Sequence, residues 1–279
     1  MTLPTESVKL GIIAGAGQLP QRIIDICLQQ KRPFYIIAFE NQTDPMLVEN
    51  HPHIWCKLGQ TKLAFDYLKE SGVQEVVMVG PIKRPAWSEL KPDTFTATWL
   101  AKHLHKIFGD DSLLRAVIDL FETQGFKVVS AEDIIGASLL APRGIMGKYP
   151  PTSQDQQDIS LGIKVATVLG SCDIGQAVVI QQGLVLGVEA IEGTEALLKR
   201  CAFLKRPGSG GALIKVTKPQ QETRVDRPTV GLETLKRIQE SGFKGLAVEA
   251  FGVIMLDKEE MIQFANKNKL FLIGVDKNI

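Results

Sequence analysis

The feature of this chain that most constrains its fold is the alternation of short apolar runs with longer amphipathic runs over residues 9–130. Short apolar runs typical of buried strands occupy residues 9–14, 34–39, 75–79 and 126–129. Apolar side chains recur at helical spacing in residues 20–30, 61–70 and 111–123. Strands that alternate with helices predict an α/β fold in which helices cover both faces of a parallel sheet.

The second half of the chain predicts a different α/β domain. Residues 177–181 and 184–189 are two apolar runs on either side of Gln182 and Gly183, which is typical of a hairpin and therefore of a mixed sheet. The chain has 279 residues, which favours two domains. Because residues 140–151 are rich in glycine and proline, we expect a domain over residues 1–140, a linker over 141–152 and a second domain over 153–279.

Composition excludes several classes of protein. The formal net charge of +1 gives no electrostatic support for binding nucleic acid. The sequence contains no run of about 18 apolar residues, which a membrane-spanning helix needs. Its first residues also lack the pattern of a signal peptide. The scattered cysteines have neither metal-binding nor redox spacing, so we expect reduced thiols in a cytoplasmic protein.

Asp226 is the strongest candidate for a catalytic residue, because it lies among the cations Lys215, Lys218, Arg224 and Arg227. Residues 225–227 are expected to be extended, since Arg227 precedes a proline, and Arg224 and Asp226 would then share a face. Nearby positive charge keeps a carboxylate ionised at neutral pH, which suits a metal ligand or a base acting on a phosphate. A surface loop with weak ion pairs is the alternative.

Two loops in the first half could bind a nucleotide. Residues 15–20 follow the first predicted strand and open a helix, which is a favourable place for a phosphate. The dinucleotide fingerprint requires a third glycine where this chain has Pro20, so a full NAD site is not expected, and a tight structural turn is the alternative. Lys83 and Arg84 follow the third strand, where they would meet a diphosphate or form a solvated turn.

Carboxylates also stand at the ends of predicted strands in the second half. Glu189 and Glu249 end two of these strands, and Glu192 follows shortly after the first. Mg²⁺ prefers oxygen ligands, so Glu189 and Glu192 are candidate metal ligands together with Asp226. The alternative is a helix capped by Thr194 with an exposed Glu192.

Taken in order, the motifs resemble the LpxI family of UDP-2,3-diacylglucosamine pyrophosphatases. The blocks that carry this resemblance, from about Leu10 to Gly274, are residues 15–20, 83–85, 109–115, 139–142, 173–179, 189–194, 218–219, 224–231 and 247–250. The chain departs from the pattern at Gln220 and Glu222, where Gly and Asp are expected, at Pro81, where Gly is expected, and at Phe251, where Gly is expected.

The resemblance implies a hydrolase of lipid A synthesis that cleaves the diphosphate of UDP-2,3-diacylglucosamine to lipid X and UMP. It implies a Rossmann-like N-terminal domain, a distinct C-terminal domain, Mg²⁺ dependence with Mn²⁺ able to substitute, and catalysis by Asp226. Lys215, Lys218 and Arg224 are expected to supply positive charge to the transition state. The residues expected to bind substrate are Gly15, Gly17, Gln18, Leu19, Pro20, Lys83, Arg84, Gln176, Thr194 and Thr229.

Two other functions are compatible with parts of the sequence: a nucleotide-dependent oxidoreductase and a non-catalytic module that binds nucleotide-sugars or lipids. The implied substrate is a lipid-linked nucleotide-sugar, so we expect peripheral contact with the cytoplasmic face of the inner membrane. Residues 199–206 place cations on both sides of a short apolar stretch and are a candidate for that contact. The sequence leaves a homodimer open.

Overall fold

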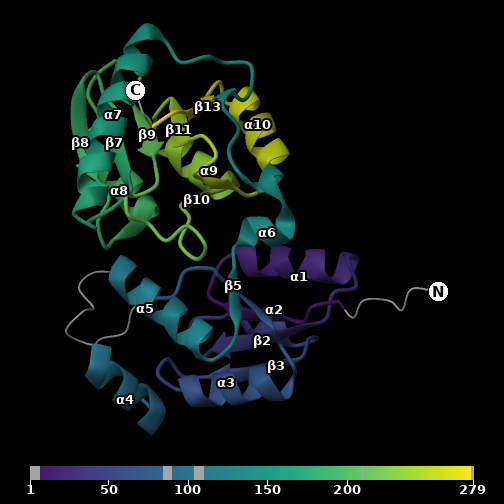
Figure 1. Ribbon diagram of the computed structural model, residues 1–279. Helices are drawn as coiled ribbons and strands as arrows, with labels where there is room; N and C mark the ends of the chain where they lie inside the picture. The colour runs from purple at the N-terminus through teal and green to yellow at the C-terminus, as the bar shows by residue number, and fades with distance from the viewer. Residues whose placement is uncertain (1–6, 84–89, 104–109, 209, 278–279) are drawn as a thin grey trace. The chain divides into compact units, whose positions relative to one another are not determined.

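The computed structural model describes residues 7–83, 90–103, 110–208 and 210–277 (Figure 1). The chain divides into two compact units. The first unit contains residues up to Ala137 together with Glu222–Val225, and the second contains Ser138–Gln221 and Asp226 onward. Among the described helices, none combines the length and the apolar character needed to cross a bilayer.

The first unit is built on a five-stranded parallel sheet with the order β3-β2-β1-β4-β5. The strands are β1 (Leu10–Ala14), β2 (Phe34–Phe39), β3 (His53–Cys56), β4 (Glu75–Val79) and β5 (Lys127–Val129). The strand order reverses between β1 and β4, which is the point where ligands bind in open α/β sheets. This sheet confirms the predicted Rossmann-like architecture.

Helices cover both faces of this sheet. They are α1 (Leu19–Gln29), α2 (Pro45–Val48), α3 (Thr61–Glu70), α4 (Thr94–His103), α5 (Asp110–Thr123) and α6 (Ala131–Ile135), and a short 3₁₀ helix follows at Ala137–Leu139. One face packs Ile13, Ile37 and Val76 against α3 and α5, where Phe65 and Phe121 make an edge-to-face contact. Alternate strand residues point to the opposite face, because side chains alternate along a strand.

The second unit is built on a six-stranded mixed sheet with the order β6-β13-β11-β9-β7-β8. The strands are β6 (Gly144–Ile145), β7 (Ala177–Gln181), β8 (Leu184–Val188), β9 (Ala212–Lys215), β11 (Gly245–Glu249) and β13 (Phe271–Val275). Strands β9, β11 and β13 are parallel, whereas β6 and β7 run antiparallel to their neighbours. A separate parallel pair joins β10 (Thr229–Val230) to β12 (Ile254–Met255).

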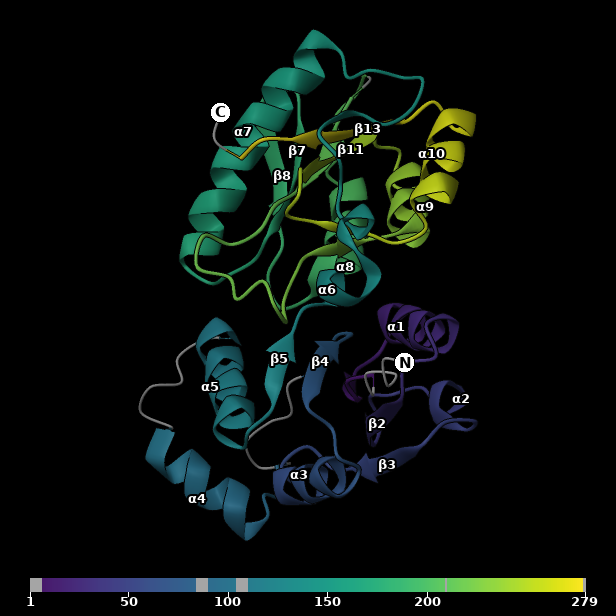
Figure 2. The ribbon, with the colours of Figure 1, turned by 45° about the vertical axis from the view of Figure 1, so that its right-hand side comes forward.

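Alternating side chains of these strands build a core on each face of the second sheet. Val178, Ile180 and Ile214 pack with α7 (Ser153–Ser171). Val179 and Leu213 pack on the other face, with α8 (Gly193–Ala202), α9 (Leu232–Glu240) and α10 (Lys258–Lys267). Figure 2 shows α7 on one side of this sheet and α9 and α10 on the other.

The segment expected to be a linker is folded into the second unit. Ala141 is fully buried, and its N–H donates to the carbonyl of Val253 at 2.9 Å. β6 extends the sheet by pairing with β13, and Met146 lies in the core. The units therefore divide at Ala137 and Ser138 rather than across residues 141–152.

Candidate active site

The polar residues of the second unit gather at one edge of its sheet. β8, β9, β11 and β13 end at this edge, and β7 begins there because it runs antiparallel to both neighbours. Glu189 directly follows β8, Lys215 ends β9, Glu249 ends β11, and Gln176 precedes β7. The mixed topology thus brings together side chains that are far apart in the sequence.

A buried ammonium and a buried carboxylate meet at this edge through the hydroxyl of Thr194. The hydroxyl of Thr194 donates to Glu189 Oε1, and it accepts from Lys215 Nζ at 2.9 Å. This direction of donation is fixed, because an ammonium only donates and a carboxylate only accepts. Lys215 Nζ also donates to the carbonyl of Thr229 at 3.2 Å, and the N–H of Gln176 donates to Glu189 Oε2 at 3.3 Å.

Asp226 joins the same network through Gln221. The Nε2 of Gln221 lies 2.7 Å from Asp226 Oδ2 and 3.1 Å from Gln176 Oε1. The Oε1 of Gln221 accepts the N–H of Lys218 at 2.9 Å. We call the connected residues Gln176, Glu189, Thr194, Lys215, Gln221 and Asp226 the strand-end network.

Two of the predicted catalytic cations have carboxylate partners. Lys218 Nζ lies 2.6 Å from Asp173 Oδ1. In the first unit, Arg224 Nε lies 3.0 Å from Glu222 Oε1, and Arg224 Nη1 lies 2.7 Å from Glu122 Oε1. The hydrogen bond from Arg224 holds the pKa of the Glu222 carboxyl below its ordinary value. These pairs offset the positive charge that the sequence assigned to Lys218 and Arg224.

The extended conformation expected for residues 225–227 is not found at Val225. Residues 223–225 form a turn, and the N–H of Val225 donates to the carbonyl of Glu222 at 3.2 Å. Because Arg224 and Val225 lie in this turn, the extended conformation that would have put Arg224 and Asp226 on one face is absent at these residues. A proline constrains the residue directly before it, here Arg227, and that constraint does not extend back to Val225.

Glu192, a predicted metal ligand, lies at the start of α8. Its Oε1 lies 2.8 Å from Arg200 Nη2, and its Oε2 accepts the N–H of Ala190 at 3.1 Å. The hydrogen bond from Arg200 lowers the pKa of Glu192. Within the residues that the structure describes, no group of three or more His, Cys, Asp and Glu side chains could hold a metal ion.

The donor set therefore does not form a three-ligand cage from Asp226, Glu189 and Glu192. It does fit a cation held by one or two carboxylates and by phosphate oxygens of a substrate, which is a common arrangement for Mg²⁺. Asp226 and Glu189 belong to one hydrogen-bonded network, and a carboxylate oxygen that accepts a hydrogen bond can also bind a cation, because it carries two lone pairs.

The predicted nucleotide-binding loops of the first unit follow β1 and β4, where the strand order reverses. The N–H of Gly15 donates to the carbonyl of Val79 at 2.8 Å, and a side chain at Gly15 would lie 2.3 Å from the carbonyl oxygen of Gly80. Close packing of the two loops is therefore sufficient to explain why residue 15 is a glycine. Leu19 and Pro20 are buried at the start of α1, whereas Gly17 and Gln18 are exposed.

Lys83 is exposed, and its backbone exchanges hydrogen bonds with the side chain of Gln42. Arg84 lies outside the described residues. Of the predicted substrate-binding residues, Gln176, Thr194 and Thr229 therefore meet in the second unit, whereas residues 15–20 and Lys83 belong to the first.

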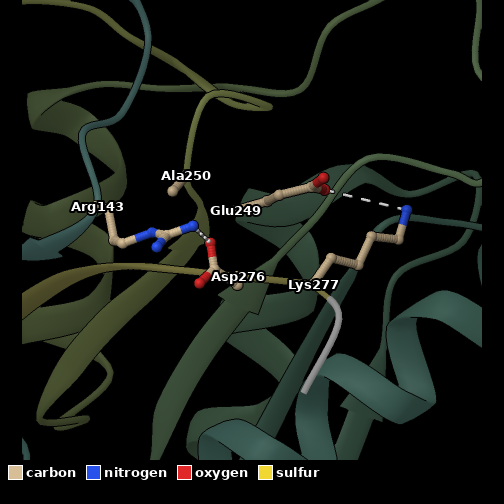
Figure 3. Close-up of a pocket in the computed structure, with 5 residues that line it drawn as sticks. All are labelled: Arg143, Glu249, Ala250, Asp276 and Lys277. Atoms are coloured by element: carbon tan, nitrogen blue, oxygen red, sulfur yellow. Dashed lines mark ion pairs between the residues drawn. The ribbon is translucent and has the colours of Figure 1, made fainter.

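A hollow of about 350 Å³ lies at the same sheet edge (Figure 3), lined by Arg143, Glu249, Ala250, Asp276 and Lys277. Arg143 Nη2 lies 2.6 Å from Asp276 Oδ1, and Lys277 Nζ lies 4.0 Å from Glu249 Oε2. Glu249 Oε2 also accepts from the N–H and the hydroxyl of Thr217, at 2.7 and 2.6 Å. The hollow thus borders the segment that leads from β9 to Lys218.

Sequence reasoning missed the contributions of Gln221 and Lys277. Gln221 lies close to residues 218–219, one of the blocks that carry the LpxI resemblance, and this was the signal that could have selected it. Lys277 follows the last strand and carries no local signal, because only the pairing of β13 with β11 brings it to this edge.

Comparison with known proteins identifies the family to which both halves of the chain belong. A family model described as the LpxI N-terminal domain matches residues 9–138, and one described as the LpxI C-terminal domain matches residues 142–273. The chain belongs to the LpxI family. A family member from Caulobacter vibrioides, UDP-2,3-diacylglucosamine pyrophosphatase LpxI, is 38% identical over 275 residues, which are 96% of this chain and 98% of the relative.

Two solved structures match this LpxI-family chain with low sequence identity and low structural similarity. CobK precorrin-6A reductase matches 98% of this chain and 89% of its own length, with 10% identity and a TM-score of 0.31. N5-carboxyaminoimidazole synthase from Aspergillus clavatus matches 72% of this chain and 44% of its own length, with 10% identity and a TM-score of 0.24.

Proposed function

We propose that this protein hydrolyses the diphosphate of UDP-2,3-diacylglucosamine to lipid X, which is 2,3-diacylglucosamine 1-phosphate, and UMP, as a step in lipid A synthesis. Membership of the LpxI family and the name of the Caulobacter relative support this reaction. The observation that carries the proposal is the strand-end network, which connects Asp226 to a buried lysine and a second carboxylate.

In this reaction one phosphoanhydride bond breaks, and the oxygen of a water molecule forms the new bond to phosphorus. We assign to Asp226 the orientation of that water. Lys215 provides a positive charge beside the developing negative charge of the diphosphate. Its ammonium is fixed by the Thr194 hydroxyl and the Thr229 carbonyl, so little reorganisation is needed when charge develops.

A divalent cation, Mg²⁺ or Mn²⁺, is the proposed cofactor, with Asp226 and Glu189 as its protein ligands and substrate oxygens completing its coordination. When bound, it would neutralise the diphosphate and stabilise the leaving phosphate. Exhaustive treatment with EDTA should abolish release of UMP, and Mg²⁺ or Mn²⁺ should restore it. Full activity after removal of all divalent cations would contradict the metal requirement but not the hydrolysis.

The substitution Asp226→Asn tests the central assignment, because it removes the charge and keeps the shape of the side chain. We expect release of UMP from UDP-2,3-diacylglucosamine to fall well below a tenth of the wild-type rate, while circular dichroism and the melting temperature stay unchanged. A folded variant that keeps more than about a tenth of the rate would show that Asp226 supplies less than about 1.4 kcal/mol.

The same assay separates hydrolysis from a non-catalytic binding role. A wild-type protein that binds the nucleotide-sugar tightly but releases no UMP, with and without Mg²⁺, would favour a binding module. We place the active protein in the cytoplasm, in peripheral contact with the inner membrane, because the implied substrate carries two acyl chains.

A further inference from the structure

We propose that Gln221 is a positioning residue that holds Asp226 in its reactive orientation. This inference rests on the hydrolysis proposed above. Gln221 is only 8% exposed, although a glutamine in an irregular segment is usually solvated. Burial of an amide costs free energy unless its donors and acceptor are satisfied, so its partners need to be examined.

The contacts of Gln221 leave no ambiguity in the orientation of its amide. The backbone N–H of Lys218 can only donate, so the group that it meets at 2.9 Å is the amide oxygen. The NH₂ group therefore faces Asp226 Oδ2 at 2.7 Å and Gln176 Oε1 at 3.1 Å. One N–H is available for each of these acceptors.

The position of the Asp226 side chain depends on hydrogen bonds, because Asp226 lies outside regular secondary structure. It follows the turn at residues 223–225 and precedes β10, which begins at Thr229. A catalytic group that shifts by about 1 Å can lose about two orders of magnitude in rate, since reacting atoms must be held close together. A short hydrogen bond from a buried amide restricts the rotation of the Asp226 carboxylate.

Gln221 also connects Asp226 to the rest of the strand-end network. Gln176, which accepts from Gln221, donates its own backbone N–H to Glu189 at 3.3 Å. Glu189 in turn is bonded to Thr194, and Thr194 to Lys215. Through these contacts the Asp226 carboxylate is positioned against residues at the ends of β8 and β9.

The test compares two substitutions at Gln221 with a matched control at its neighbour. Gln221→Ala removes the whole contact. Gln221→Glu keeps the length of the side chain and an acceptor for the Lys218 N–H, but replaces the donors by a negative charge beside Asp226. Gln220→Ala is the control, because Gln220 Nε2 donates to the carbonyl of Gly170, at 2.9 Å, outside the network.

We expect both Gln221 variants to lose about tenfold or more in kcat, with KM within about twofold of the wild type, and Gln220→Ala to stay near wild type. If Gln221 only filled space, Gln221→Met, which keeps the length of the side chain without a donor or a charge, would keep its activity. If Gln221→Ala fails to fold, Gln221→Glu and Gln221→Met carry the test, because both preserve the length of the side chain.

Three results would overturn the positioning role: kcat within about twofold of wild type in both variants, loss of activity in Gln221→Ala alone, or a change confined to KM. Each requires a wild-type protein that hydrolyses UDP-2,3-diacylglucosamine, so it leaves the proposed function intact. A wild-type protein without hydrolytic activity would overturn the function and, with it, this role.

Discussion

At the scale of single residues, Thr194 determines how two buried charges are accommodated. Lys215 and Glu189 are both buried, and burial of an isolated charge is costly. The Thr194 hydroxyl accepts from the ammonium and donates to the carboxylate, so the two charges compensate each other through one oxygen. This arrangement explains how charged groups can remain at a sheet edge that is otherwise packed.

Phe251 is a second informative residue, because it stands where the family pattern has glycine. Its φ of +59° lies in the left-handed region, which is unfavourable for a bulky side chain and unstrained for glycine. The backbone is held there by a 2.8 Å bond from its N–H to Ala141 and a 3.2 Å bond from Arg227 Nη1 to its carbonyl. Phe251 is 61% exposed, and it follows Glu249 and Ala250, which line the hollow at the sheet edge.

The pair between Glu222 and Arg224 predicts a pH-dependent contribution to stability. Arg224 lowers the pKa of Glu222 in the folded protein. A lowered pKa stabilises the fold above the unfolded value of about 4.3, and this stability is lost as the pH falls through the folded value. Glu222→Gln should therefore lower the free energy of unfolding by about 1 kcal/mol at pH 7.

The difference between Glu222→Gln and the wild type should shrink as the pH falls below about 4, because the wild-type carboxyl is then protonated as well. Melting temperatures measured across this range provide the test. Glu233→Gln is a suitable control, since Glu233 pairs with Lys236 on an exposed helix face and such pairs contribute little. Equal stability of Glu222→Gln and wild type at pH 7 would show that the ion pair contributes nothing.

At the scale of secondary structure elements, the β7–β8 hairpin depends on a helix distant in the sequence. Gln182 and Gly183 both have positive φ, as a two-residue hairpin turn requires. Their N–H groups donate to the buried carboxylate of Asp158 in α7, at 2.8 and 2.7 Å. α7 itself begins with a capping box formed by Thr152 and Asp155.

The close approach of α7 to β9 predicts an unusual response to Gly162→Ala. A methyl group at this position would lie 2.7 Å from Cγ1 of Ile214, which is fully buried. Alanine normally stabilises a helix relative to glycine by about 1 kcal/mol, but overpacking costs about 1–3 kcal/mol. We expect a net loss of stability in denaturant unfolding, whereas Lys164→Ala, at an exposed position of the same helix, should change little. A more stable Gly162→Ala protein would contradict this packing.

At the scale of the whole molecule, the question is how this chain would reach the proposed lipid substrate, since none of its described helices could span a membrane. Cys201 is buried in the core, so the apolar stretch predicted at residues 201–204 is only partly available. Phe203 and Leu204 are 87% and 54% exposed at the end of α8. We define the basic-apolar patch as Lys199, Arg200, Phe203, Leu204, Lys205 and Arg206, all of which are exposed.

We expect this patch to bind anionic membranes, with each cation near the surface contributing about 1 kcal/mol and Arg200 contributing less, because it is paired with Glu192. Sedimentation with vesicles should increase with the content of anionic lipid and decrease with salt. Replacement of the four cations of the patch by glutamine should weaken the binding. The matched control neutralises four exposed lysines elsewhere in the second unit: Lys164, Lys244, Lys267 and Lys269. Equal sedimentation of both variants would show that the patch is not the contact.

The four strands and three helices predicted for the first unit are found, because each has its own periodic pattern, whereas β3, α2, α4 and α6 were not predicted. The helix expected over residues 20–30 is α1, and the hairpin expected around Gln182 and Gly183 is β7 and β8. β6 was not predicted, because a two-residue strand such as Gly144–Ile145 carries no periodicity and exists only by pairing with β13. The linker expected over residues 141–152 is instead part of the second unit, because β6 within it pairs with β13.

The candidate site was predictable only as a set of residue types. Asp226, Glu189 and Lys215 were selected from charge and from their places after strands, and the structure connects them. By contrast, Lys218 pairs with Asp173 and Arg224 pairs with Glu122 as well as with the neighbouring Glu222, and both Asp173 and Glu122 are distant in the sequence. Ion pairs of this kind depend on folding, so charge patterns along the chain cannot assign them.

The sequence by itself determined the α/β class and the family, and it selected Asp226 as the candidate catalytic carboxylate, because local periodicity and ordered motifs are properties of the chain. Only the tertiary structure decided which side chains meet. The antiparallel entry of β7 between β8 and β9 brings Gln176, Glu189 and Lys215 to one edge. Gln221 then fixes Asp226 there through hydrogen bonds that extend only over about 3 Å. Such short-range contacts form only after the sheet has set the strand order.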